Sequence, residues 1–167
     1  MKLIKPSDLT EKEFAPYGTI ISIPRNISNK RSGQHWKCWS SIHRFLNLTQ
    51  FSIGAVEIQN QTKEIIEMER HPNHQELIIC GKNTMFLPVA ISKNINNPLE
   101  VPLKKNVKIF QLTAGEIVVL HKGIWHSACF SSSKNSIYFF GIGINNKTNF
   151  KPKMVPLETS LYIDFTS

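Results

Sequence analysis

"MERHPNHQELIICGKN", residues 68–83, places charged and apolar residues in an order that decides the fold. A Glu, an Arg, two His and a second Glu fall within nine positions, and the chain then enters the apolar run of residues 77–80. Charged groups at the entrance to a core strand are costly to bury unless they are paired or bound to a cation. The stretch therefore predicts two strands joined by a turn, with its charges at the rim of a cavity.

The rest of the chain continues this pattern of short strands. Runs rich in Ile, Val and Phe alternate with turn residues such as Gly81-Lys82-Asn83 and Lys122-Gly123. These runs occupy residues 19–23, 51–58, 65–71, 76–80, 85–91, 107–112, 117–121, 124–130 and 137–144. Many short strands without a second long helix predict an all-β sandwich or barrel. We see no repeat or linker, so one domain is expected over residues 1–167.

Two N-terminal stretches depart from this pattern. Residues 10–13, Thr-Glu-Lys-Glu, have the form of a helix capping box, and a proline and a glycine soon follow. One short N-terminal helix is therefore expected. Residues 24–41 are polar and irregular, and they predict a loop or lid.

Composition restricts the classes of partner. The formal charge is +8, but the basic residues are scattered and no nucleic-acid motif accompanies them. A solvated surface that attracts a small anionic substrate is favoured over nucleic-acid binding. No run approaches the ~18 apolar residues of a membrane helix, and no signal peptide is recognised, so a cytoplasmic protein without membrane contact is expected. Cys80 and Cys129 lie in apolar runs and are expected to act as small hydrophobic residues.

Titratable residues from two separate stretches are candidates for a site. Side chains alternate along a strand, so Glu69 and His71 point the same way. Glu76 opens the next strand, where its side chain can fold back beside His71. His126 projects among apolar neighbours, where a His is more often a core residue than a metal ligand. The competing structural interpretation makes Glu69 and Arg70 exposed strand residues and His71 a cap of the turn.

Taken together, the two stretches resemble the paired motifs of the cupin superfamily. Glu69-x-His71-x4-Glu76 resembles H-x-H-x4-E, with Glu69 in place of the first His. Asn83 takes the position of that motif's turn Gly, and Asn tolerates the left-handed conformation. Gly115-x5-His121-x-Gly123-x2-His126 resembles G-x5-P-x-G-x2-H, with His121 in place of Pro. The resemblance implies an all-β cupin double-stranded β-helix, a jelly-roll barrel with a short N-terminal helix.

Within the cupins, the chain most resembles the ureidoglycolate lyase family. The resemblance lies in "LTEKEFAPYGTII" (residues 9–21), "EMERHPNHQELII" (residues 67–79) and "HKGIWHSACF" (residues 121–130). It implies a carbon–nitrogen lyase that splits ureidoglycolate into glyoxylate and urea in allantoin degradation. It also implies a homodimer.

The resemblance implies a role for seven residues. The expected metal ligands are His71, Glu76 and His126, the acid or base is Glu69 or His121, and the substrate-binding residues are Lys82 and Trp125. Mixed nitrogen and oxygen ligands favour a divalent ion such as Ni, Zn, Mn or Fe. The family resemblance implies that the metal is nickel.

The sequence also departs from the family. Where the family tends to show Ile-Asp-Arg, this chain has Ile142-Gly143-Ile144, and an Arg is a natural clamp for a substrate carboxylate. We therefore expect this chain to bind the substrate carboxylate more weakly than other family members do. Lys82 is the candidate to replace the missing Arg. Two alternatives stay open: a non-catalytic cupin module that binds a small anionic metabolite, and a metal-dependent isomerase or oxygenase acting on another small acid.

Overall fold

The computed structural model describes residues 3–23, 30–33, 35–45, 50–59, 63–144 and 153–165. The elements in chain order are β1 (Leu3–Ile4), β2 (Ser7–Asp8), α1 (Glu11–Phe14), β3 (Gly18–Ile21), β4 (Lys30–Gly33), β5 (Trp36–Trp39), β6 (Gln50–Ile58), β7 (Glu64–Met68), β8 (Glu76–Lys82), β9 (Met85–Ala90), the 3-10 helix η1 (Lys104–Asn106), β10 (Lys108–Leu112), β11 (Ile117–Leu120), β12 (Trp125–His126), β13 (Ser136–Ile144) and β14 (Val155–Ile163). The strands confirm the predicted all-β, cupin-like class. Among the described residues, no helix has the length and apolar character needed to cross a bilayer.

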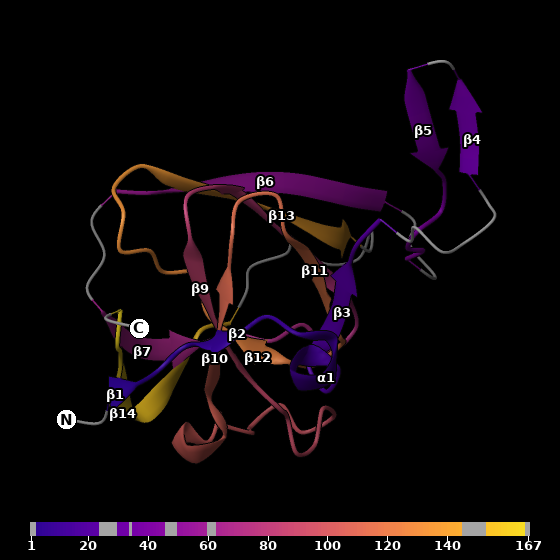
Figure 1. The fold of residues 1–167 in the computed structure, drawn as a ribbon. Helices are drawn as coiled ribbons and strands as arrows, with labels where there is room; N and C mark the ends of the chain where they lie inside the picture. The colour runs from indigo at the N-terminus through magenta and orange to yellow at the C-terminus, as the bar shows by residue number, and fades with distance from the viewer. Residues whose placement is uncertain are drawn as a thin grey trace.

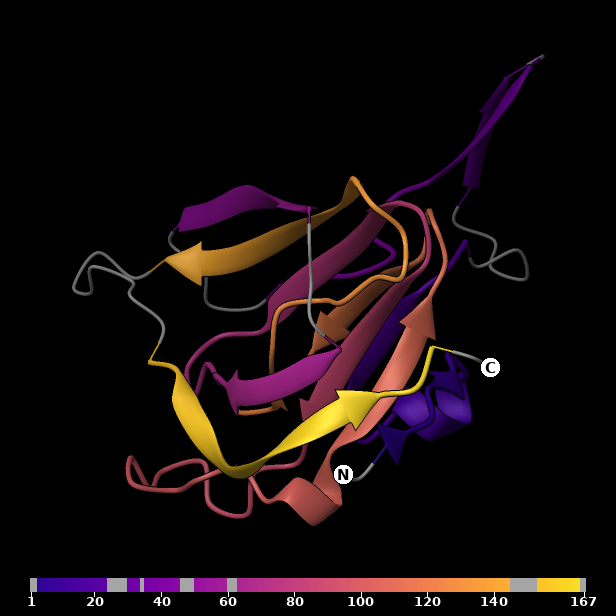
Figure 2. The same cartoon turned by 90° about the vertical axis from the view of Figure 1, so that its left-hand side faces the viewer.

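The strands form sheets around a common interior (Figures 1 and 2). A five-stranded sheet has the order β3-β11-β8-β13-β6, a four-stranded sheet β12-β9-β10-β2, and a three-stranded sheet β1-β14-β7. The hairpin β4–β5 pairs only within itself in the described sheets and projects from the body. The interior face of the five-stranded sheet supports the site described below.

The four-stranded sheet contributes to two hydrophobic cores. Every residue of β9 is buried. Its alternate residues Met85, Leu87 and Val89 belong to one core, whereas Phe86 and Ala90 belong to the other. A strand that is covered on both faces reads as a continuous apolar run, which explains the sequence Met-Phe-Leu-Pro-Val-Ala.

The N-terminal helix is confirmed, and it closes one end of the first core. The Thr10 hydroxyl oxygen accepts a hydrogen bond from the Glu13 backbone N–H at 3.3 Å, as a capping box requires. At the end of α1, Phe14 is fully buried and meets the ring of Phe110 edge-on at a centroid distance of 5.0 Å.

Two parts of the chain are more regular than predicted. The stretch 24–41, expected to be a loop, contains the β4–β5 hairpin within its described residues. That hairpin lacks an alternating apolar pattern, so periodicity could not reveal it. The nine-residue strand β14 was also missed, because an irregularity between Pro156 and Leu161 interrupts its pairing with β7 and its alternation.

Five described residues have left-handed φ angles, and three of them lie in turns of the two motifs. Asn83, at the predicted turn position, has φ 66°, which confirms that it takes the role of a glycine. Gly115 has φ 91° and Gly123 has φ 75°. The Gly123 N–H donates to the His71 carbonyl oxygen at 2.9 Å, so this turn ties the second motif to the first.

We predict that Gly123→Ala destabilises the fold more than Gly115→Ala. Both substitutions force a non-glycine residue into a left-handed conformation, at a cost of about 1 kcal/mol or more. A Cβ at Gly123 would also overlap the side chain of Ile95, whereas a Cβ at Gly115 meets no atom within 4 Å. Chemical denaturation of both variants measures the difference, which we expect to be about 1–3 kcal/mol. Equal losses would contradict the close packing of Ile95 on this turn.

Candidate active site

Backbone hydrogen bonds join the two motif segments. The Glu69 N–H donates to the His126 carbonyl oxygen at 2.7 Å, and the His126 N–H donates to the Glu69 carbonyl oxygen at 2.8 Å. Glu76 begins β8, where it pairs with Leu120 of β11 and Ile142 of β13. The structure therefore brings Glu69, His71, Glu76 and His126 together, although they come from distant parts of the sequence.

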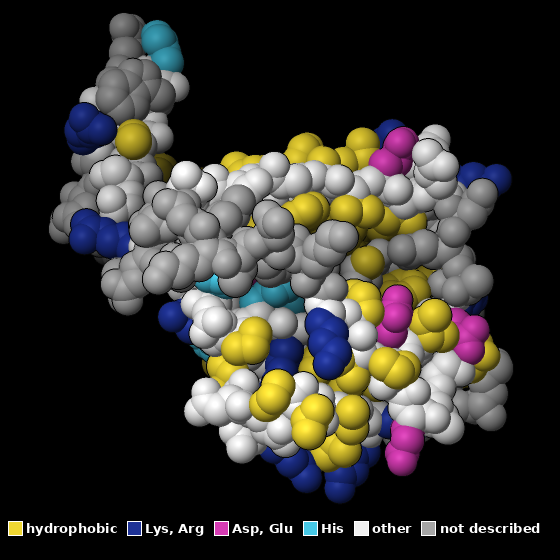
Figure 3. Space-filling model, turned by 180° about the vertical axis from the view of Figure 1, so that it is seen from behind, with side chains coloured by type: hydrophobic (Ala, Val, Ile, Leu, Met, Phe, Trp, Pro, Cys, Tyr) yellow, Lys and Arg dark blue, Asp and Glu magenta, His cyan; other side chains and the backbone are white. Residues whose placement is uncertain are grey.

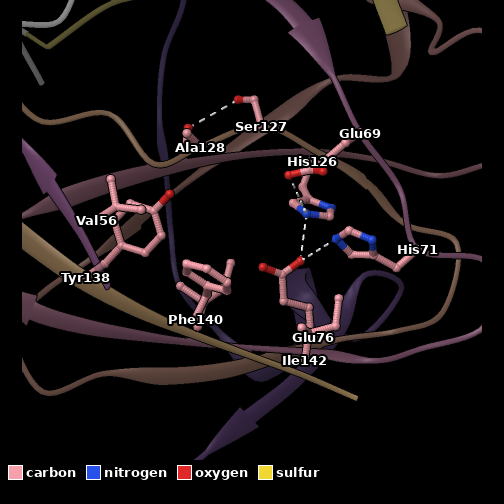
Figure 4. A pocket seen from close by; sticks show the side chains of 11 residues that line it. Val56, Glu69, His71, Glu76, His126, Ser127, Ala128, Tyr138, Phe140 and Ile142 are labelled. Carbon is pink, nitrogen blue, oxygen red and sulfur yellow. Dashed lines mark hydrogen bonds and ion pairs between the residues drawn. The ribbon is translucent and has the colours of Figure 1, made fainter. Parts of the chain in front are cut away.

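The four side chains converge on one point (Figure 4). The Glu76 Oε2 atom lies 3.0 Å from His71 Nε2 and 2.7 Å from His126 Nε2. Glu69 Oε1 lies 3.9 Å from His126 Nε2. His126 Nδ1 donates to the Ile124 carbonyl oxygen at 3.1 Å, which directs Nε2 towards the carboxylates.

Burial and charge shift the pKa values of this cluster in different directions. Burial alone would raise the pKa of Glu76, but attraction to the His126 and His71 imidazoles outweighs it and lowers this pKa to about 2. Burial likewise opposes the charged form of His126, yet Glu76 and Glu69 raise its pKa to about 9. The pKa of Glu69 is raised because burial outweighs its attraction to the imidazoles. In the metal-free protein, Glu69 is therefore the more easily protonated carboxylate.

The donor atoms of this cluster fit a divalent metal ion. Glu69, His71 and His126 each offer one ligand atom, and these three atoms lie within 4.8 Å of one another. Glu69 Oε2 is buried without a hydrogen-bond partner, and the buried Glu76 Oε2 and His126 Nε2 atoms lie 2.7 Å apart in the same cluster. Buried polar atoms without partners are costly, and a cation between them would satisfy their lone pairs. Imidazole and carboxylate ligands suit the first-row divalent ions.

The cluster forms the polar end of a pocket of about 360 Å³. The pocket is lined by Val56, Glu69, His71, Glu76, Ile78, His126, Ser127, Ala128, Tyr138, Phe140 and Ile142. Burial raises the pKa of Tyr138, so its phenol stays neutral. We did not identify this wall from the sequence, although alternation along β13 places Tyr138, Phe140 and Ile142 on one face.

Three residues predicted for the site do not line this pocket. Lys82 is exposed at the end of β8. His121 is exposed and lines a separate pocket beside α1, because it follows the core residue Leu120 and faces the other way. Trp125 is buried, but strand alternation turns its ring away from the side that carries His126. Substrate binding by Lys82 and Trp125 and acid–base chemistry by His121 stay predictions, which the pocket geometry does not favour.

The surface view shows where charged side chains and histidines lie on one face of the molecule. Figure 3 shows histidine side chains on this face, near Lys and Arg side chains. Lys and Arg side chains are dispersed over the same face. Among its described lining residues, the pocket itself contains neither Lys nor Arg.

Comparison with known families shows which family this chain belongs to. A family model described as "Ureidoglycolate lyase" matches residues 1–159 of the 167 residues. The chain belongs to the ureidoglycolate lyase family. This confirms the family predicted from the resemblance of residues 9–21, 67–79 and 121–130. A search of curated proteins found no match.

The pKa values predict how the stability of the metal-free protein depends on pH. His126 has a folded-state pKa of about 9, above its ordinary value of 6.5. Protonated His126 therefore contributes to the free energy of unfolding in full below about pH 6.5, and this contribution is lost as the pH rises through 9. We expect a loss of at most about 3 kcal/mol over this range.

Thermal unfolding in chelator between pH 6 and 9.5 measures this effect. Other groups also titrate in alkaline solution, so His126→Gln is the control, and its melting temperature should fall less over the same range. Parallel profiles for the parent and His126→Gln would contradict the assigned ion pair with Glu76.

Proposed function

We propose that this pocket is where the protein splits ureidoglycolate into glyoxylate and urea. The family match over residues 1–159 identifies a lyase. The observation that carries the assignment to this pocket is the convergence of two imidazoles and two carboxylates at its polar end. Pockets of roughly 300–1,000 Å³ that combine apolar walls with a few polar groups are typical of small-molecule sites.

The reaction requires two proton movements. The hydroxyl of ureidoglycolate loses a proton, its carbon–oxygen bond becomes the carbonyl of glyoxylate, and the carbon–nitrogen bond breaks. The departing urea nitrogen takes up a proton, so the reaction has no net proton change. One group that accepts the first proton and returns it to the nitrogen is sufficient.

Glu69 is our candidate for that group. Its Oε2 atom is buried in the pocket without a hydrogen-bond partner. Its raised pKa makes the carboxylate a better proton acceptor than Glu76, whose pKa is about 2. Tyr138 is neutral and can donate a hydrogen bond to a substrate oxygen.

We assign His71, Glu76 and His126 as the residues that would hold a divalent ion, because Glu76 Oε2 lies 3.0 Å from His71 Nε2 and 2.7 Å from His126 Nε2. Glu69 also offers a ligand atom to the two imidazoles, and we assign it to proton transfer because its pKa is raised. The ion is nickel by family resemblance, with zinc, manganese and iron as alternatives. Such an ion, when bound, lowers the pKa of a coordinated hydroxyl and draws the substrate carboxylate. The Ile124 carbonyl orients His126 for this role by accepting its Nδ1–H.

A turnover assay tests the proposed reaction. The purified protein is loaded with Ni²⁺, Zn²⁺, Mn²⁺ or Fe²⁺, and the release of urea and glyoxylate from ureidoglycolate is measured. We expect turnover that chelator abolishes. Thermal stabilisation by ureidoglycolate without turnover would instead support a non-catalytic binding module.

Four variants separate the proposed roles. His71→Ala and His126→Ala should lose bound metal and turnover, because both imidazoles are ligands. His74→Ala should keep both, since His74 does not line the pocket. Glu69→Gln should keep the metal but lower kcat by about 100-fold or more, because the amide cannot accept the proton. Elemental analysis and steady-state kinetics measure these outcomes, and full metal occupancy in both His71→Ala and His126→Ala would refute the metal site.

We also propose a cytoplasmic homodimer, on family grounds and from one apolar surface. Phe51, Ile53 and Phe139 are 39%, 63% and 40% exposed. The register of β6 and β13 places all three on the outward face of the five-stranded sheet. Exposed apolar groups gathered on one face are typical of interfaces.

Light scattering measures the oligomeric state. We expect a dimer for the parent and a monomer for Ile53→Glu, which places a charge within this face. Ile66→Glu is the matched control, because Ile66 is 57% exposed but lies on β7 in another sheet. A dimer that persists in Ile53→Glu would contradict this interface.

A further inference from the structure

We propose that Arg70 is a positioning residue that holds the metal-binding side chains in place from outside the pocket. The proposal rests on the metal site assigned above. Arg70 lies between Glu69 and His71 in the sequence, and strand alternation directs its side chain away from theirs. It does not line the pocket that contains Glu69 and His71.

Arg70 stacks on the residue beside the third histidine. Its guanidinium carbon lies 4.5 Å from the ring centroid of Trp125, which directly precedes His126. Trp125 is 2% exposed, and the Arg70 side chain is 6% exposed. The stack therefore lies behind the Glu69–His126 backbone bridge, with the ligand side chains in front of it.

The guanidinium is also anchored to the loop of residues 92–100. Nη1 lies 2.6 Å from Glu100 Oε2 and 2.5 Å from Ser92 Oγ. Nη2 donates to the Asn97 carbonyl oxygen. Glu100 in turn accepts hydrogen bonds from Ser92 Oγ at 2.7 Å and from the Lys93 N–H at 2.6 Å. A planar guanidinium with several partners has little freedom to move.

The same loop supports the second motif. The side chain of Ile95 lies so close to Gly123 that any Cβ there would overlap it. Gly123 donates its N–H to the His71 carbonyl oxygen. Residues 92–100 thus hold His71 by two routes, one through Arg70 and the other through Gly123.

These contacts predict a specific effect on metal binding. Groups that orient metal ligands typically change metal affinity by about 10–100-fold when they are removed. Loss of Arg70 frees the segment that carries Glu69 and His71 and removes the stack beside His126. A purely structural Arg70 would instead lower the melting temperature without changing the affinity of the folded protein for metal.

Cobalt(II) titration, followed by its visible absorbance, separates these possibilities without an activity assay. The parent, Arg70→Gln, Arg70→Lys and Phe110→Leu are compared well below their melting temperatures. We expect about 10–100-fold weaker cobalt binding in Arg70→Gln. Arg70→Lys keeps the charge but loses the planar fork, so it should bind more weakly than the parent and more tightly than Arg70→Gln. Phe110→Leu is the control for general destabilisation: it should lower the melting temperature and leave cobalt affinity unchanged.

Glu100 provides a further check on the mechanism. Arg70→Gln/Glu100→Gln should bind cobalt no more weakly than Arg70→Gln, because the two residues act as one unit. Parental affinity in Arg70→Gln overturns this inference and leaves the metal site standing. If Arg70→Gln does not fold, parental affinity in Arg70→Lys overturns it. A parent that binds no cobalt overturns the metal site and this inference together.

Discussion

The backbone bridge between Glu69 and His126 is the interaction on which the site depends. Its two hydrogen bonds, at 2.7 and 2.8 Å, fix the relative register of two segments that are remote in sequence. Strand alternation then sorts their side chains. Glu69, His71 and His126 meet Glu76 on one side, whereas Arg70 and Trp125 stack on the other. A shift of one residue in this pairing would exchange the two sets and remove the ligand cluster.

The cluster is costly for the fold that contains it. His71, Glu76 and His126 are buried, and burial disfavours the charged forms of the two residues whose pKa values shift most, Glu76 and His126. Their mutual attraction offsets the cost only in part, because the buried Glu69 Oε2 atom lacks a hydrogen-bond partner. Natural proteins tolerate such local costs where a function requires them, and the apolar cores on both faces of β9 supply compensating stability.

Local patterns in the sequence predicted much of this architecture. The nine expected strands correspond to observed elements, because alternation and turn residues act over a few positions. Motif spacing predicted the convergence of His71, Glu76 and His126, and the left-handed turn at Asn83. Local patterns could not predict which remote segments of the chain contact one another. The competing interpretation treated Arg70 as an exposed strand residue, whereas its partners lie in a loop that no periodicity connects to it.

The direction of side chains at strand ends was also beyond prediction. His121 and Lys82 lie at positions where a strand finishes, so small changes in backbone direction decide whether they face the pocket. Trp125 was predicted from the family resemblance, although strand alternation already placed it on the face opposite His126. The family resemblance indicated which residue types belong to the site, but it did not indicate the direction of their side chains.

The charge of the pocket has a consequence for how the substrate binds. The described lining residues include two carboxylates and no Lys or Arg. In the metal-free pocket the imidazolium of His126, whose pKa is about 9, offsets part of this negative charge, so an anionic substrate gains little net attraction there. A divalent cation would add net positive charge, so cation and substrate should each strengthen the binding of the other by the same factor. Because Ile144 stands where the family tends to have an Arg, we expect carboxylate recognition to depend on the proposed cation.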